Sequence, residues 1–233
     1  MTTASAEPPP RRAESPSRRP QGGPPLLAPV LAFAVLTVAY VIVNRSTPHL
    51  DATGADVLRY ASAHRTTVKA GSLLLFASSV PLALTAAILY RRLRALGITA
   101  PGSAITLVGG VLASSALALS GMFGWAGGRL SSDGGPALAR VLADLSFLAG
   151  GPAYATTFAL LMAGISVTGL LAGLLPRALA WPGLALAAVG VVSELTLVAD
   201  AFQYLLPIAR FGGLLWLVIV AVKLPRTRPS RHQ

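Results

Sequence analysis

Long uncharged runs of apolar residues, separated by short polar and basic segments, dominate the pattern along this chain. Residues 26–43, 70–90, 103–128 and 145–176 contain no charged side chain. These runs show neither the stripe of an amphipathic helix nor the alternation of a half-buried strand. An apolar run of about 20 residues is long enough to cross the hydrocarbon of a bilayer as a helix. The pattern therefore predicts an all-α polytopic membrane helix bundle.

We place about six transmembrane helices and expect short helices on the outer face. The predicted spans are residues 26–43, 70–90, 103–128, 153–173, 181–199 and 204–222. The uncharged run 145–176 would be about 45 Å long as one helix, longer than the roughly 30 Å of hydrocarbon. We expect Gly150, Gly151 and Pro152 to break it, leaving an outer helix at 136–149. We also expect Pro81 to bend the second span, because proline removes a backbone hydrogen bond.

The segments that flank the membrane domain have a different composition. Residues 1–25 are rich in proline, serine and arginine without apolar periodicity, which predicts a disordered tail. Residues 26–224 form the membrane domain, and 225–233 are a second basic tail. Overall, 54% of the residues are hydrophobic and only 12% are charged, against about a quarter charged in soluble domains. The chain has no cysteine, which excludes disulfides and thiolate metal sites.

The basic residues predict the orientation in the membrane, because cytoplasmic segments retain positive charge during insertion. Arg91, Arg92 and Arg94 directly follow the second span, whereas the next connection offers Arg129 beside Asp133. We therefore expect both termini in the cytoplasm of a bacterial cell and the protein in the cytoplasmic membrane. The positive charge lies in tails and loop ends and not on a folded face with stacking aromatics, so we expect no nucleic-acid partner.

Known catalytic and cofactor motifs are absent from the sequence. No histidine lies in a predicted span, which argues against bis-histidine haem ligation. Thr53 followed by Asp56 is typical of a helix start, with Val57, Leu58 and Ala61 facing the bilayer. We prefer this interpretation to a metal site and predict neither a metal nor a cofactor. The alternative metal ligands would be His49, Asp51, Asp56 and His64.

One group of ionisable residues falls inside or beside the predicted spans, where charge is costly and usually has a partner. Glu194 and Arg210 each lie eight residues from Phe202, which places both roughly 10 Å below the turn between the last two helices. We predict a Glu194–Arg210 pair there. The whole candidate polar cluster comprises Glu194, Arg210, Asp200, Asp144 and Arg140, and its role is either a structural ion pair or a substrate or proton site.

Four segments resemble an uncharacterised class of six-span membrane proteins from high-GC bacteria that carry a domain of unknown function. They are Ser79-Val80-Pro81-Leu82, Arg91-Arg92-Leu93-Arg94, Gly150-Gly151-Pro152, and Leu206-Pro207-Ile208-Ala209-Arg210-Phe211 leading to Trp216. The resemblance covers most of residues 26–225. It implies the six-span topology and brings no activity, cofactor or catalytic residue.

Three functional hypotheses follow from the sequence. The leading one is a non-enzymatic sensor, scaffold or partner subunit of the membrane. The alternatives are a small-solute or ion transporter and a membrane-embedded enzyme acting on a lipid or isoprenoid. Besides the lipid bilayer, the partners compatible with the sequence are another protein or a second copy of this chain. Small residues at Gly110, Ser114 and Ala118 would allow a helix to approach closely, within the bundle or across a dimer.

Overall fold

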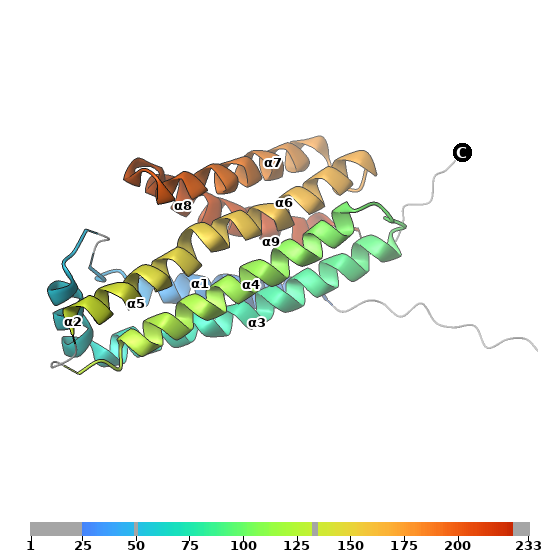
Figure 1. Ribbon diagram of the computed structural model, residues 1–233. Helices are drawn as coiled ribbons and strands as arrows, with labels where there is room; N and C mark the ends of the chain where they lie inside the picture. Colours follow the sequence, from blue (N-terminus) through green and yellow to red (C-terminus); the bar gives the residue numbers. More distant parts are fainter. Residues whose placement is uncertain (1–24, 49–50, 132–134, 226–233) are drawn as a thin grey trace, which may run out of the picture.

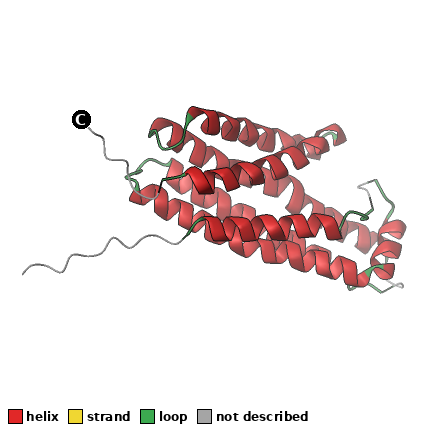
Figure 2. Cartoon of the chain, turned by 180° about the vertical axis from the view of Figure 1, so that it is seen from behind, coloured by secondary structure: helices red, strands yellow, loops and turns green. Residues whose placement is uncertain are grey.

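The described part of the chain is entirely helical. A computed structural model describes residues 25–48, 51–131 and 135–225, and Figure 2 shows that helices and short connections make up all of this part. The predicted all-α class is therefore confirmed. The N-terminal tail predicted to be disordered and the basic C-terminal tail lie, except for residue 25 and residue 225, outside the described residues.

Five helices in the described part are long and apolar enough to cross a membrane. They comprise α3 (Arg65–Ala95), α4 (Gly102–Gly127), the run from α5 (Pro136–Leu148) through η1 (Ala149–Ala153) to α6 (Tyr154–Leu171), α7 (Arg177–Val192) with η2 (Ser193–Leu197), and the C-terminal run. That last run contains η3 (Asp200–Tyr204), α8 (Leu205–Pro207), η4 (Ile208–Gly212) and α9 (Gly213–Lys223). The first predicted span forms α1 (Leu27–Val43), an apolar helix of 17 residues, at the lower limit for crossing a bilayer.

The predicted break at Gly150, Gly151 and Pro152 is wrong. The chain stays helical from Pro136 to Leu171, and the three residues lie in the π-helical turn η1. A π turn accommodates a proline without ending the helix because the backbone bonds shift from i−4 to i−5 around it. The helix α3 also contains a proline, Pro81, and continues through it as one helix, while the bend expected there stays a prediction.

The six apolar helices pack as a closed ring. Neighbouring contacts run from α1 to α3, then to α4, α6, α7 and α9, and α9 returns to α1. Figure 1 shows α3 and α4 side by side along one side of the bundle and α7 on the other, with α6 between them. The core between them holds Phe33, Leu82, Phe158 and Leu217, all of them essentially unexposed.

Small residues of α4 serve contacts inside the bundle. A Cβ added to Gly110 would lie 2.3 Å from the Cβ of Ala86 and 2.8 Å from Leu161. The Ser114 hydroxyl donates to the carbonyl of Ser79 on α3 at 2.7 Å. Two of the three small residues singled out in the sequence, Gly110 and Ser114, therefore join α4 to α3 and α6.

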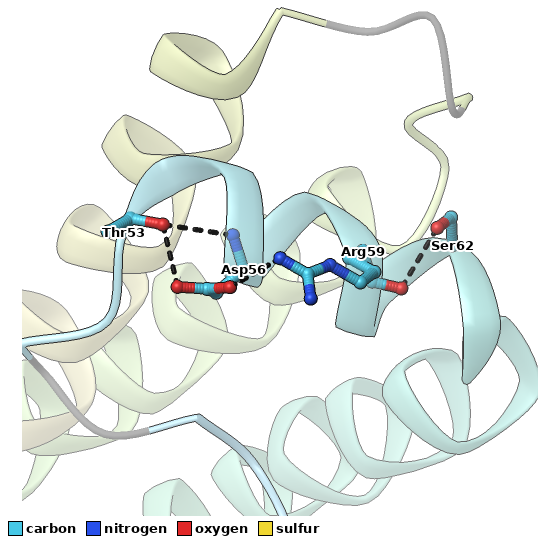
Figure 3. Close-up of polar contacts among 4 residues, drawn as sticks. All are labelled: Thr53, Asp56, Arg59 and Ser62. Carbon is cyan, nitrogen blue, oxygen red and sulfur yellow. Dashed lines mark hydrogen bonds and ion pairs between the residues drawn. The ribbon is translucent and has the colours of Figure 1, made fainter.

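A short outer layer covers one end of the ring. It consists of α2 (Gly54–Ala63) packed against α5, at the left end of Figure 1. The predicted start of α2 is confirmed, because the Asp56 N–H donates to the Thr53 hydroxyl at 3.2 Å and Arg59 pairs with Asp56 at 2.6 Å (Figure 3). Leu58 and Ala61 are buried within the protein, so the expectation that they face lipid is wrong.

Candidate functional site

Two of the five predicted cluster residues form an ion pair on α5. The Arg140 guanidinium lies 3.0 Å from the Asp144 carboxylate. It also donates from Nη1 to the carbonyl of Ala52, at 2.6 Å. Both side chains are partly exposed, at 34% and 43%. Arg140 therefore fastens the connection before α2 onto α5, at the end of the bundle that α2 covers.

The predicted pairing of Glu194 with Arg210 is wrong. Glu194 and Asp200 are exposed and have no hydrogen bond or ion pair with the described residues. The prediction assumed regular α-helix on both sides of Phe202, whereas Glu194 lies in a 3₁₀ segment and Arg210 in a π-helical one. A 3₁₀ helix turns about 20° more per residue than an α-helix, so five such residues change side-chain direction by about 100°.

Arg210 instead contacts the π turn between α5 and α6. Its Nη2 donates to the carbonyl of Gly150, and its guanidinium lies over the ring of Tyr154, 5.1 Å from the centroid. In a regular α-helix the Tyr154 N–H would donate to the Gly150 carbonyl. Here it donates to Ala149 and Gly151. The Gly150 carbonyl has thus lost its regular donor and accepts from Arg210 in its place.

Arg210 lies at one end of a cavity of about 510 Å³ in the half of the bundle that α2 covers. The walls come from α1 to α6, with η1, η3, α8 and η4, and most of the lining is apolar. Three charged residues line the cavity: Arg140, Asp144 and Arg210. Because Asp144 is paired with Arg140, the net charge left on the lining is that of Arg210.

The cavity has an outer and a deep end. Val57, Ala61 and Ala139 of the outer layer line one end, while Leu75 and Tyr154 line the other. Asp144 precedes Gly150 by six residues, or about 9 Å along the helix. The Arg140–Asp144 pair therefore lies toward α2, and Arg210 lies deeper in the bundle.

Hydroxyl groups gather beside Arg210. The Ser120 and Ser146 side chains donate to each other's backbone carbonyls at 2.7 and 3.0 Å. A Cβ on Gly150 would lie 2.4 Å from the Ser120 hydroxyl and 4.0 Å from Arg210. Ser120, Ser146 and Gly150 all line the cavity. The deep end is thus a polar patch within apolar walls.

Tyr154 contributes a donor that nothing in the described chain uses. The residue is only 1% exposed, and its hydroxyl has no hydrogen-bond partner among the described residues. Most buried polar groups are hydrogen-bonded, so an exception calls for an explanation. The ring itself is held by stacking on Phe158, with centroids 5.3 Å apart.

Sequence reasoning found three of the cavity's charged residues but missed Tyr154, Ser120 and Ser146. Tyr154 was detectable as the tyrosine two residues after Pro152 of the Gly-Gly-Pro motif, inside an uncharged run. The serines carried no signal, because hydroxyls in apolar helices usually bond to the preceding turn of their own helix. Only the packing of α4 against α5 brings these two together.

The rejected metal hypothesis has no geometric support in the described residues. No group of three histidine, cysteine, aspartate or glutamate side chains there is placed to bind a metal ion. Asp56 is held by Thr53 and Arg59, and His64 stacks on Tyr60. His49 lies outside the described residues.

Fold and site together fit a class of multi-pass helical membrane proteins with a half-enclosed cavity at one end of the bundle. Comparison with family models, with curated proteins and with solved structures found no match to this chain.

Proposed function

We propose that this protein is a non-enzymatic membrane factor, a sensor or partner subunit, that binds an amphiphilic small molecule in the outer cavity. The observation that carries the proposal is the cavity itself. Its volume of about 510 Å³ lies in the range of small-molecule sites, which are largely apolar with a few placed polar groups. Apolar walls and a polar patch at one end match the two parts of an amphiphile.

The state of the polar groups favours binding over catalysis. Asp144 is the carboxylate that lines the cavity in the described chain, and it is occupied by Arg140. Ser120 and Ser146 donate to carbonyls. General acid–base catalysis needs a titratable group within reach of the substrate, and none of these groups is free for that role.

A transport function is the second candidate, and a separate observation favours it. Two π-helical segments, η1 and η4, meet where Arg210 donates to Gly150. Irregular helical turns that line a cavity are typical parts of transporters. Solute flux in proteoliposomes would distinguish this candidate from a sensor.

The binding proposal is tested with an uncharged amphiphile, a monoacylglycerol with a photoreactive group on its chain. We expect crosslinks on peptides that line the cavity, and competition by the unlabelled compound. Ala143 lines the cavity, whereas Ala137 on the same helix is exposed and lies outside it. Ala143→Phe should reduce the crosslinking strongly and Ala137→Phe should not. Crosslinks confined to the lipid-facing surface would contradict the proposal.

A further inference from the structure

Arg210 is a cation in an apolar segment, and no acidic residue in the described part of the chain pairs with it. It is the single charged residue between Asp200 and Lys223. Within the described chain its contacts are the Gly150 carbonyl and the Tyr154 ring, and no carboxylate pairs with it. Ionisable residues inside membrane spans are costly and face partners or cavities, where they mark ligand pathways. A guanidinium remains charged at any physiological pH.

The guanidinium keeps donors in reserve. It has five N–H groups, and one of those on Nη2 donates to the Gly150 carbonyl. The guanidinium also lies over the Tyr154 ring, which restricts its position. A planar guanidinium held in this way is suited to bidentate binding of a carboxylate or phosphate. Tyr154 also lines this end of the cavity, and its buried hydroxyl is a second donor without a partner in the described chain.

We propose that the cavity binds a single-chain amphiphile with an acidic headgroup, a carboxylate or a phosphate, whose charge is neutralised by Arg210. The proposal rests on the proposed binding function and names its ligand class. The headgroup lies against Arg210, with Ser120 and Ser146 beside it. The hydrocarbon chain follows the apolar walls toward Ala61 and Ala139 of the outer layer.

Charge complementarity selects the acidic headgroup over a neutral or cationic one. Asp144 is occupied by Arg140, and about 9 Å of helix separates it from Gly150, so the deep end lacks a negative group. A cationic headgroup would meet Arg210 unscreened, whereas an anion supplies the missing countercharge. Placing an anion beside an otherwise unpaired cation in a low-dielectric site is favourable.

The test compares three photoreactive probes with the same chain on the full-length protein in a neutral detergent. They are a fatty acid, a lysophosphatidic acid and a monoacylglycerol. We expect the acidic probes to crosslink to cavity peptides at least about tenfold more efficiently than the neutral one, as for one charge-assisted bidentate contact. The comparison needs no variant. The better of the two acids identifies the headgroup as carboxylate or phosphate.

Two variants of Arg210 test whether this residue causes the preference for acidic probes. Arg210→Gln should abolish the preference for acidic probes, and Arg210→Lys should restore part of it because the charge returns without the fork. Arg129→Gln is the matched control, since Arg129 also stacks on an aromatic ring, Trp125, at 5.0 Å, but is exposed outside the cavity. It should leave the preference unchanged.

A third variant tests the orphan hydroxyl. Tyr154→Phe should weaken binding of the acidic probes about fivefold, as expected for one hydrogen bond. Its thermal stability without ligand should not fall, because the lost hydroxyl had no partner. A fall in ligand-free stability with unchanged probe binding would show that the hydroxyl is structural and would remove Tyr154 from the site.

Each failure has a distinct meaning. Equal cavity crosslinking by acidic and neutral probes, unaffected by Arg210→Gln, would overturn the acidic headgroup and leave the binding function intact. Absence of cavity crosslinks with every probe would overturn the binding function as well. If inorganic phosphate alone displaced the acidic probes, the proposal that the ligand is an amphiphile would be wrong, because the apolar walls would then contribute nothing to binding.

Discussion

Arg210 shows how a local backbone irregularity decides the partner of a charged side chain. The sequence predicted a pair between Arg210 and Glu194, because both residues lie eight positions from Phe202 in the turn between the last two helices. The π turn at Gly150 changed the outcome, because it released a carbonyl that a charged donor could satisfy. Glu194 lies at an exposed position of η2, away from Arg210.

A double-mutant cycle tests this assignment at the residue scale. Glu194→Gln should change the free energy of unfolding in detergent by less than about 0.5 kcal/mol, as for an exposed side chain without a partner. Arg210→Gln should cost about 1–3 kcal/mol, because the Gly150 carbonyl loses a charged donor. The double variant should show the sum of the two effects. If the double variant recovered stability, Glu194 and Arg210 would interact after all, and the absence of the ion pair from the structure would be contradicted.

A second prediction at this scale concerns the cap of α2. The Thr53 hydroxyl hydrogen-bonds the Asp56 carboxylate and, with the Arg59 charge, lowers the pKa of that carboxyl. Because the pKa is lowered in the folded state, the ionised carboxylate stabilises α2 at pH values above the usual pKa range of aspartate. That support is lost as the pH falls through the lowered value. Thr53→Ala should cost about 1 kcal/mol of helix stability.

Hydrogen exchange of residues 54–63 measures both effects on α2. Exchange should accelerate in Thr53→Ala and, in the native protein, as the pH falls below the usual aspartate range, after correction for intrinsic rates. Ser62, whose hydroxyl bonds only to the Arg59 carbonyl on the same helix, gives the control variant Ser62→Ala. Equal acceleration in the control would mean that the cap is not what holds α2.

At the scale of elements, close approach of helices depends on positions that tolerate no side chain. A Cβ on Gly109 of α4 would lie 2.4 Å from the backbone nitrogen of Leu161. No real Cβ contact is that short, so α4 and α6 would have to separate. Gly127, near the end of the same helix, meets nothing closer than Leu142 at 4.0 Å.

These two glycines give a matched pair of substitutions. Gly109→Ala should destabilise the protein by about 1–3 kcal/mol, the usual cost of overpacking. Gly127→Ala should be neutral or stabilising by at most about 1 kcal/mol, because alanine favours the helix. Thermal unfolding in detergent measures both. A stabilised Gly109→Ala protein would contradict the packing of α4 on α6.

At the scale of the whole molecule, the ring of six helices brings both described ends to one end of the bundle. Leu26 and Leu224 share the core cluster, and Arg92, in the basic segment after the second span, donates to the Leu224 carbonyl at 3.4 Å. The outer layer of α2 and α5 lies at the opposite end (Figure 1). The relative arrangement is therefore fixed, while the side of the membrane stays a prediction.

Topology reporters test that side. A reporter after Gln233 should read as cytoplasmic, and one near Gly54 should read as external, because the basic segments remain on the cytoplasmic side. Neutralising Arg91, Arg92 and Arg94 together should produce mixed orientation. A cytoplasmic signal at Gly54 would invert the arrangement and place the cavity on the inner side.

The sequence by itself determined the class of fold, the number of apolar helices and the start of α2. Those features depend on the length of uncharged runs and on hydrogen bonds between near neighbours, which the order of residues specifies directly. It also identified Arg140, Asp144 and Arg210 as costly charges. Only the tertiary structure decided their partners, because a π or 3₁₀ turn rotates every later side chain about the helix axis. The cavity likewise exists only once α1, α3, α4, the α5–α6 run and the segment before α9 pack together with α2, since its walls come from residues far apart in the chain.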